Sequence, residues 1–299
     1  MKAGVIAPQG WTGEYNGWEP GRAWARTVAV AQQAERLGFE SVWLFDHFHT
    51  VPRPTDELTF ESFTSLSALA ALTDRVQLGH IVICNGFRNP SLTAKMASTL
   101  DTISGGRFEL GIGAGWKKDE WLAYGYGFPE TKERLAMLHD ALEVIGRMLE
   151  PGRATHATYA GAHHSVTDAR NLPKPVSEHG MPIMVGGNGP KVTWRLAARY
   201  ADELNVDGMS PDEVREALPV IRSRCEEIGR DPDSLSVSVH VWWGTPEWRT
   251  PGPGRVALLT DYRELGLSRV IGLLQASADD DGALEALVED ARAAGVELT

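Results

Sequence analysis

The stretch RLGFESVWL, residues 36–44, ends a helix and starts a strand within nine residues. Gly38 follows a helical pattern at the position where a left-handed residue commonly closes a helix. The apolar run after it has the short length of a buried strand. The stretch GLSRVIGL, residues 266–273, repeats this order near the other end of the chain. Helix, glycine and strand in close succession indicate β/α units, in which parallel strands alternate with covering helices.

The same alternation extends along the whole chain. Apolar runs typical of strands lie at 2–8, 41–45, 76–83, 107–112, 182–186, 203–206, 235–241 and 269–274. Segments with helical spacing follow them, at 21–37, 60–72, 90–103, 131–148, 190–201, 211–229, 254–265 and 282–295. Eight repeats with apolar strands favour an α/β fold of the TIM (β/α)8 barrel type, formed by residues 1–299 as a single domain. A doubly wound sheet with a C-terminal appendage is the alternative.

One segment interrupts the alternation. Residues 150–181 are rich in Gly, Pro and His, and they form a connection longer than most loops in compact domains. We therefore expect an insertion after the fourth helix. Its role is left open between a lid, a small added β-hairpin and a surface excursion without a function.

Composition and charge narrow the classes of function. The formal net charge of -11, without a stripe of Lys and Arg, makes nucleic acids and anionic membrane surfaces poor partners. No apolar run approaches the roughly 18 residues of a membrane-spanning helix, and the N-terminus lacks the apolar core of a signal peptide. Cys84 and Cys225 match no metal-binding or redox spacing. We expect a cytoplasmic protein that acts on a small molecule.

An acid and two histidines follow the second expected strand in LFDHFHT, residues 44–50. The carboxyl ends of barrel strands carry the functional site, so Asp46, His47 and His49 are candidate site residues. A metal site would need further ligands, and later strand ends offer His240 but no convincing carboxylate set, so we expect no metal. Proton transfer by a histidine beside Asp46 and a hydrogen-bonded polar strand end both stay open.

Two glycine-rich turns also follow strands. In GIGAGW, residues 111–116, Trp116 occupies the place of the third glycine of a dinucleotide-binding motif, which weakens that interpretation. In VGGNGP, residues 185–190, the glycines precede a helix that we expect to begin at Pro190. Backbone N–H groups at the start of a helix favour a phosphate. A tight turn that needs positive φ is the alternative.

Several of these segments together resemble the bacterial-luciferase-like superfamily. They are WLFDHFHT (43–50), LGHIVICNGFRNPSLTAKMASTLDTISGGRFELGIGAGW (78–116), YGYGFPETKERLAML (124–138) and MPIMVGGNGPKVTWRLAARYADELNV (181–206). Within the superfamily, FDHF, CNGFRNP and SGGRFELGIGAGW are most similar to oxidoreductases that use the deazaflavin coenzyme F420. The resemblance covers about residues 1–210 and implies a TIM barrel that binds F420 or, alternatively, FMN.

The resemblance also implies roles for individual residues. His47 matches a histidine that handles a proton near the reactive ring carbon, and Asp46 matches its neighbour that contacts the ring. The third strand matches the place of a bulge with a non-prolyl cis peptide behind the ring, which we expect at Ile81–Val82. The other residues matched to cofactor contacts are Asn85, Gly113, Ala114 and Gly115 beside the ring or its side chain, and Gly186, Gly187, Asn188 and Gly189 at the phosphate.

One position departs from the superfamily's pattern. Its deazaflavin-dependent sugar-phosphate and alcohol dehydrogenases carry a glutamate soon after strand four, where this chain has Trp116. Glu120 lies a turn later, so we expect His47 to act alone, and a sugar phosphate or simple alcohol is disfavoured as substrate. Trp11, Trp116 and Trp243 at strand ends indicate a pocket for a flat apolar substrate, although tryptophans also pack barrel rims.

The expected function is hydride transfer between reduced F420 and an electron-poor C=C, C=N or C=O carbon, with His47 as proton donor or acceptor. FMN-dependent monooxygenation in the same barrel is the first alternative. A non-catalytic flavin-binding protein is the second, and the intact His47 and the open glycine loop after strand four count against it. The resemblance further implies a homodimer without indicating its interface.

Overall fold

The computed structural model describes residues 1–152 and 155–299. The strands of its main sheet are β1 (Lys2–Ile6), β2 (Ser41–Leu44), β3 (Gln77–His80), β4 (Ile83–Cys84), β5 (Phe108–Gly113), β8 (Ile183–Gly186), β9 (Glu203–Asp207), β10 (Ser236–Val241) and β11 (Arg269–Leu273). The helices are α1 (Pro20–Leu37), α2 (Ser62–Leu72), α3 (Pro90–Ser104), α4 (Lys118–Ala123), α5 (Thr131–Leu149), α6 (Thr193–Tyr200), α7 (Pro211–Glu226), α8 (Pro246–Arg249), α9 (Pro253–Glu264) and α10 (Gly282–Ala293). The described residues also form three short 3-10 helices, η1 (Asn85–Phe87), η2 (Pro232–Ser234) and η3 (Gln275–Ala278).

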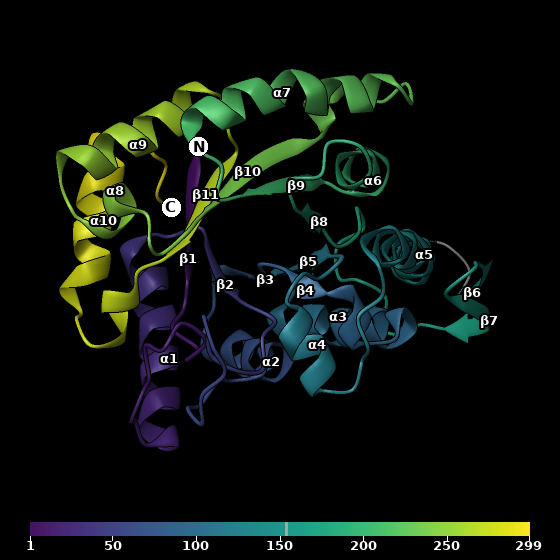
Figure 1. Cartoon of the computed structure of the whole chain (residues 1–299), viewed down its shortest axis with the longest axis horizontal. Coiled ribbons are helices and arrows are strands. Elements are labelled where there is room, and N and C mark those ends of the chain that lie inside the picture. The colour runs from purple at the N-terminus through teal and green to yellow at the C-terminus, as the bar shows by residue number, and fades with distance from the viewer. Residues whose placement is uncertain (153–154) are drawn as a thin grey trace.

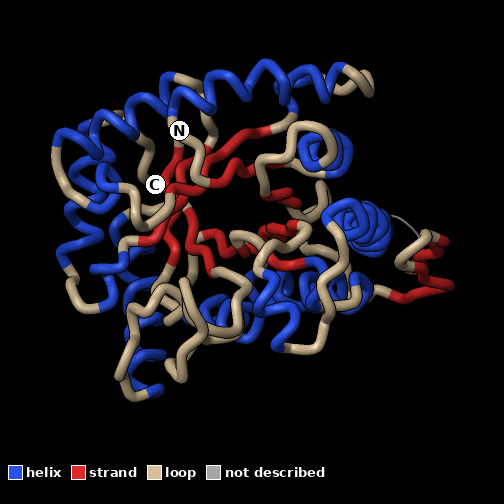
Figure 2. Tube along the Cα trace, viewed as in Figure 1, coloured by secondary structure: helices blue, strands red, loops and turns tan. Residues whose placement is uncertain are grey.

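The main sheet closes into a barrel. Its strands are parallel and follow the order β3-β2-β1-β11-β10-β9-β8-β5-β4, and a further pairing joins β3 to β5. The strands lie inside a ring of helices, as Figures 1 and 2 show. The expected TIM barrel is confirmed. The doubly wound alternative is wrong, because β3 and β5 would not pair with each other in an open sheet.

A bulge interrupts the third barrel strand. Gly79 of β3 pairs with Glu109, and Ile83 of β4 pairs with Ile112, so that three residues face two between these pairs. One extra residue on one strand defines a β-bulge. The cis Ile81–Val82 peptide lies inside this step, and the non-prolyl cis peptide implied by the resemblance is confirmed at this bond.

Most helix ends follow the signals in the sequence. Gly38 ends α1 in the left-handed region, at φ 92°, and its N–H donates to the carbonyls of Ala34 and Glu35. A left-handed residue is the common way to satisfy the last carbonyls of a helix. Ser210 and Glu213 form a capping box ahead of α7, whose first residue is proline.

The helix expected from Pro190 begins later, at Thr193. The Asn188 amide accepts from the Asp207 N–H at 2.8 Å and donates to the Asp207 carbonyl at 2.7 Å. The Trp194 indole N–H donates to the carbonyl of Gly187 at 3.0 Å. These bonds fold the segment between β8 and α6 into a loop against β9, so that Pro190 lies outside the helix.

The insertion between α5 and β8 contains an antiparallel hairpin, β6 (His156–Ala160) and β7 (Ser165–Arg170). The hairpin projects from the barrel beside α5 in Figure 1. The Asp140 carboxylate on α5 accepts from the N–H groups of His163 and His164 at the hairpin tip. The described residues of the hairpin line neither cavity at the strand ends, so the hairpin interpretation is confirmed and no contact supports a lid.

Trp43 fills the barrel interior. Its side chain is fully buried, and its indole N–H donates to the Ser41 hydroxyl at 2.8 Å. Gly4 and Gly79 on the flanking strands leave room for the ring, because a Cβ at Gly4 would lie 2.7 Å from the indole nitrogen and one at Gly79 would overlap the ring. Glycine on these strands is therefore a packing requirement.

A charged cluster closes the amino-terminal end of the barrel. Arg269 pairs with Glu40, Glu109 and Glu203, and its guanidinium lies 5.1 Å from the Trp43 ring. We call these four charged residues the barrel-floor cluster. Burial raises the pKa of Glu109 to about 8, although Arg269 acts in the opposite direction. The barrel-floor cluster thus closes this end of the barrel with side chains that are buried and paired with one another.

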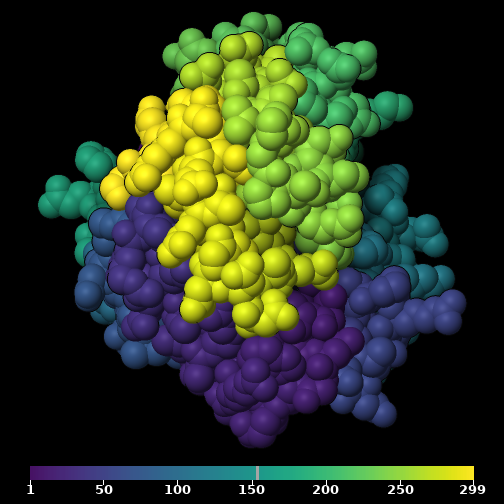
Figure 3. Space-filling view, turned by 90° about the vertical axis from the view of Figure 1, so that its left-hand side faces the viewer, coloured from purple at the N-terminus to yellow at the C-terminus, as the bar shows by residue number. Residues whose placement is uncertain are grey.

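The two ends of the chain meet on one side of the barrel. β1 pairs with β11 in register from Lys2 opposite Arg269 to Ile6 opposite Leu273. α10 packs against α1, and Figure 3 shows the yellow C-terminal segment lying beside the purple N-terminal one. Within residues 1–152 and 155–299, no helix has both the length and the apolar character needed to cross a membrane.

Candidate active site

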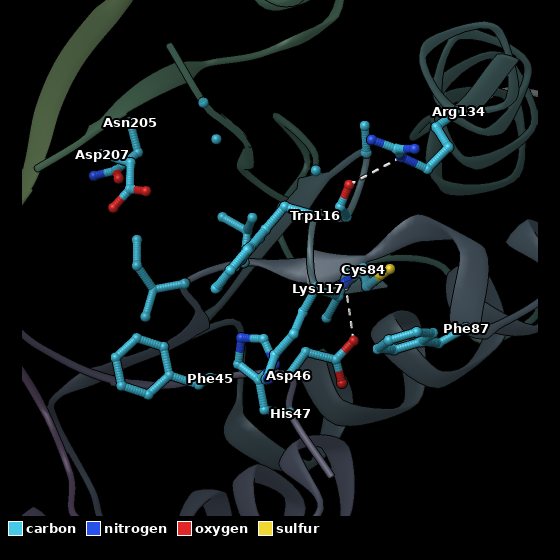
Figure 4. A pocket seen from close by; sticks show the side chains of 18 of the residues that line it. Phe45, Asp46, His47, Cys84, Phe87, Trp116, Lys117, Arg134, Asn205 and Asp207 are labelled. Carbon is cyan, nitrogen blue, oxygen red and sulfur yellow. Dashed lines mark hydrogen bonds between the residues drawn. The ribbon is translucent and has the colours of Figure 1, made fainter. Parts of the chain in front are cut away.

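A cavity of about 380 Å³ opens among the carboxyl ends of the barrel strands (Figure 4). This is the edge at which TIM-barrel sites form. The expected site residues that line it are Trp11, Asp46, His47, Ile81, Val82, Gly113, Ala114, Gly115, Trp116, Gly186, Gly187 and Gly189. Asn85 and Asn188 lie outside its lining, and Trp243 lines a second, adjoining cavity.

His47 is held against the cavity wall by Glu120. The Glu120 side chain is 0% exposed, its Oε2 lies 2.7 Å from His47 Nδ1, and its Oε1 accepts from the Phe48 N–H at 2.6 Å. The Trp11 indole stacks on the imidazole, with ring centroids 3.9 Å apart and planes 3° from parallel. Nδ1 is therefore engaged, whereas Nε2 has no hydrogen bond to another described residue. The structure gives His47 a carboxylate partner, Glu120 on α4, and the expectation that His47 acts alone as the general acid or base stays a prediction.

The Asp46 carboxylate joins the ends of two barrel strands. It accepts from both Nη atoms of Arg88, at 2.8 and 2.9 Å, from the Cys84 N–H at 2.9 Å and from the Ser62 hydroxyl at 3.0 Å. Burial raises the pKa of Asp46, but the Arg88 guanidinium outweighs it and holds that pKa below its ordinary value. Both oxygens are used within the protein, and the ring contact implied by the resemblance stays a prediction.

Glycines let two strands approach the bulge closely. A Cβ on Gly113 would lie 2.9 Å from Cγ2 of Val82, and a Cβ on Gly186 would lie 3.0 Å from the same side chain. A Cβ on Gly111 would collide with the carbonyl oxygen of His80, which the bulge brings onto β5. The cavity wall here consists of Val82 and bare backbone, a surface that suits a planar ring.

The turn after β8 continues this wall of the cavity. Gly186, Gly187 and Gly189 line the cavity together with Thr193, the first residue of α6. The N–H of Gly187 donates to the Asn205 carbonyl at 3.0 Å, so this donor is already used. The expected phosphate contact at Gly186–Gly189 therefore stays a prediction, with fewer free N–H groups than the sequence indicates.

A second histidine and carboxylate lie across the cavity from His47. Nδ1 of His240 is 2.9 Å from Oδ1 of Asp207, and both residues line the cavity. His240 Nε2 is buried and has no hydrogen-bond partner among the residues that the structure describes. His240 and Asp207 lie opposite each other on the neighbouring parallel strands β10 and β9. An alignment of these two strands from the sequence could therefore have predicted the pair.

Arg134 positions the loop after β5. Its guanidinium donates to the carbonyls of Gly115, at 3.2 Å, and of Pro129, at 2.5 Å. It also lies 4.0 Å from the ring of Phe128. A third bond runs from Nη2 to the Thr131 hydroxyl at 3.2 Å, and Figure 4 shows the bond to the loop. The sequence places Arg134 inside a matched motif but does not indicate this partner.

The other candidate chemistries lack support. His49 does not line the cavity, and its Nδ1 is 3.2 Å from the Thr50 carbonyl. Burial raises the pKa of the Cys84 thiol, which disfavours the thiolate form of this cavity residue. Within the described part of the chain, no group of three or more His, Cys, Asp or Glu residues could hold a metal ion.

The chain is similar to proteins of known sequence and structure. It is 35% identical over 214 residues to an F420-dependent glucose-6-phosphate dehydrogenase of Kineococcus radiotolerans, a match that covers 71% of this chain and 61% of the relative. It thus spans about three-fifths of that relative's length. An uncharacterised protein of Mycobacterium tuberculosis is 28% identical over 272 residues, which cover 86% of this chain and 90% of the relative.

Solved structures share the fold. An F420-dependent secondary alcohol dehydrogenase in complex with an F420–acetone adduct superimposes with a TM-score of 0.82 at 20% identity, covering 98% of this chain and 99% of the other. A monooxygenase of Streptomyces bottropensis gives 0.77 at 19% identity, covering 97% and 98%. At such identities the likeness concerns the fold alone. A family model for luciferase-like monooxygenases matches residues 1–243, and the chain belongs to this luciferase-like family.

Proposed function

We propose that this protein is an F420-dependent oxidoreductase, which transfers a hydride between reduced deazaflavin and an electron-poor C=C, C=N or C=O carbon. The observation that carries the proposal is the His47–Glu120 pair at the cavity wall. General acid–base catalysis needs a positioned group of this kind. The relative from Kineococcus radiotolerans, which is named as F420-dependent, supports the choice of cofactor.

The cavity residues fit a planar deazaflavin. Val82 on the bulge, with the backbone of Gly113 and Gly186, offers an apolar wall without projecting side chains from the glycines. The buried Nε2 of His240 has no protein partner among the described residues, and a polar ring edge would satisfy it. Thr193 at the start of α6 would help to hold a phosphate of the cofactor.

When bound, reduced F420 would supply the hydride: a C–H bond of the deazaflavin would break as a C–H bond forms at the acceptor carbon and the acceptor's π bond opens, so that the deazaflavin would be oxidised by two electrons. His47 carries the accompanying proton on Nε2. Glu120 fixes the imidazole through Nδ1 and stabilises the charge that the ring bears when protonated. Trp11 packs on the imidazole face and keeps the ring from rotating.

FMN-dependent monooxygenation is the second candidate. The matching family model carries the description of a luciferase-like monooxygenase, which favours it. The two candidates share the barrel and differ in cofactor and in their need for oxygen. Cofactor binding therefore separates them.

The test is a titration of purified protein with F420 and, separately, with FMN, followed by tryptophan fluorescence. Each reduced form is then assayed for turnover with conjugated ketones, imines and ketones. We expect F420 binding and oxygen-independent oxidation of reduced F420. His47→Asn should keep F420 affinity and lose most turnover, whereas His49→Asn, outside the cavity, should keep both. FMN binding with oxygen consumption, and no affinity for F420, would overturn the proposal.

A homodimer is also proposed on the basis of the family resemblance, and a cytoplasmic location on the basis of the composition and the cysteine pattern of the sequence. Sedimentation equilibrium of the purified protein tests the first, and fractionation of the source cells tests the second.

A further inference from the structure

A second cavity of about 840 Å³ adjoins the first at the mouth of the barrel. The two share Trp11, Trp116, Lys117 and Trp242 in their linings. We call the second cavity the outer chamber, and its remaining lining residues are Thr12, Val51, Pro52, Lys118, Asp119, Leu122 and Trp243. A ligand in the outer chamber would therefore lie next to the cavity that holds the His47–Glu120 pair.

Indole rings dominate the outer chamber. Trp242 and Trp243 lie 4.7 Å apart, and Trp243 meets Trp11 edge-on at 5.2 Å. Trp116 lines both cavities and is 59% exposed, and its ring lies 6.1 Å from the His47 ring in a T-shaped arrangement. Figure 4 shows Trp116 reaching across the first cavity toward His47 and Phe45. A large aromatic side chain left exposed beside other indoles is characteristic of a binding surface for flat apolar groups.

The cationic side chains that line the two cavities either bond to protein groups or lie exposed to solvent. The Lys117 side chain is 6% exposed, and its ammonium lies 3.0 and 2.8 Å from the two carboxylate oxygens of Asp119. Arg134 in the first cavity donates to the carbonyls of Gly115 and Pro129 and to the Thr131 hydroxyl. Lys118 is exposed and sits 6.0 Å from the Phe128 ring. Recognition of a phosphate needs free, convergent cationic donors, and the described lining residues do not supply such a set.

We propose that the outer chamber is the substrate site and that it selects an uncharged, flat, apolar molecule over a sugar phosphate. Its role as a substrate site rests on the proposed F420-dependent activity, whereas its ligand selectivity does not. The proposal separates this chain from the relative that is named a glucose-6-phosphate dehydrogenase. Trp116 provides the stacking face at the junction, and Trp242 and Trp243 enclose the ligand.

Isothermal titration calorimetry with three probes tests the selectivity: coumarin, coumarin-3-carboxylate and glucose 6-phosphate. Coumarin is flat and uncharged, and the carboxylate differs from it by one negative charge. We expect saturable coumarin binding, at least roughly tenfold weaker binding of the carboxylate and no saturable binding of glucose 6-phosphate. Equal or tighter binding of either anion would overturn the proposal.

Matched variants locate the site. Trp116→Ala should weaken coumarin binding about tenfold, because it removes an aromatic stacking face. The Trp116 side chain is largely exposed, so its removal should leave the fold intact. Trp24→Ala, a tryptophan on α1 outside both cavities, should not change coumarin affinity. Unchanged affinity in Trp116→Ala would refute the assignment.

A parallel titration with F420 distinguishes the two proposals. Coumarin should bind with similar affinity to the protein alone and to the F420-loaded protein. Competition between coumarin and F420 would place coumarin in the first cavity and overturn the outer chamber as its site. Coumarin binding that depends on Trp116 in a protein without F420 affinity would refute the proposed function and retain the selectivity.

Discussion

Replacing Glu120 by glutamine removes the charge beside His47 and almost nothing else. The carboxylate is fully buried and serves two donors, His47 Nδ1 at 2.7 Å and the Phe48 N–H at 2.6 Å. A glutamine oxygen can still accept from Phe48, so only the charge-assisted bond to the imidazole is lost. Such a bond contributes about 1.5–3 kcal/mol to stability. We expect the free energy of unfolding of Glu120→Gln to fall by an amount in this range.

The effect on turnover should be larger than the effect on stability suggests. General acid–base catalysis by a positioned side chain contributes roughly 10²–10⁴ in rate. Glu120→Gln leaves His47 in place but without its charged partner, so we expect kcat for oxidation of reduced F420 to fall about 100-fold. The dissociation constant of F420 should change less than about threefold, because the residues that form the glycine walls are untouched.

Glu120→Ala provides the comparison within the same site. It leaves both His47 and Phe48 without an acceptor, and each buried unsatisfied donor costs about 1–3 kcal/mol. Its unfolding free energy should therefore fall further than that of Glu120→Gln. Glu133→Gln, on the exposed first turn of α5, is the control for a change of net charge and should match the wild type.

The assay combines stopped-flow oxidation of reduced F420 with urea unfolding of the same samples. A Glu120→Gln variant that loses stability but keeps kcat within threefold of wild type would refute the reasoning. His47 would then act without a charged partner, and Glu120 would serve the fold only.

Three further predictions concern Gly113 in the cavity wall, the buried Asp46–Arg88 pair and Glu109 of the barrel-floor cluster. Gly113→Ala should weaken F420 binding at least roughly tenfold by calorimetry, since its Cβ would lie 2.9 Å from Val82. Asp46→Asn should lower the unfolding free energy by about 3 kcal/mol in urea, because Arg88 loses a buried charged partner; lost F420 affinity at full stability would instead support ring contact. The pKa of Glu109 rises from 4.5 to about 8 on folding, so its stabilising contribution is complete below pH 4.5 and is lost as pH rises to 8. In Glu109→Gln, the urea unfolding midpoint should therefore change less between pH 5 and 8 than in the wild type. A pH dependence equal to that of the wild type would contradict this prediction.

The barrel was predictable because its signals are local. Each β/α unit contains residues that mark the ends of its helix and strand. Gly38, for example, closes α1 in the left-handed conformation that its position predicts. The main error in helix boundaries, at Pro190, has a tertiary cause. Asn188 and Trp194 bond the loop to β9 and to itself before α6 can start. No pattern within residues 185–201 reveals those partners.

The bulge and its cis peptide were predictable by a different route. No periodicity marks Ile81–Val82, and the expectation came from resemblance to a family. The structure shows which residues make room for the bulge. A Cβ at Gly111, Gly113 or Gly186 would strike the bulge or Val82. Glycines at strand ends that look like turn or phosphate signals in the sequence therefore also make room for the third strand.

Side-chain partnerships were the least predictable part of the site. Glu120 lies 73 residues from His47 in the chain, and it reaches the imidazole only because the short helix α4 turns back over the strand ends. Asp46 adjoins His47 in sequence, yet its carboxylate points to Arg88 and the bulge. Neighbouring residues on a strand end face opposite ways, so Asp46 and His47 separate into different networks.

The two histidines of the cavity show one arrangement built twice from unrelated elements. His47 and His240 both turn Nδ1 to a carboxylate, at 2.7 and 2.9 Å. Phe45 lies between them, with its ring 6.4 Å from the first imidazole and 5.6 Å from the second. A carboxylate on Nδ1 orients each ring and sets the character of the remaining nitrogen. The cavity thus holds two imidazoles, each oriented by a carboxylate, and the Phe45 ring packs near both. A bound ring system with one polar edge and one reactive face would contact one imidazole with its edge and the other with its face. A ligand with charges spread over its surface would not match these two contacts.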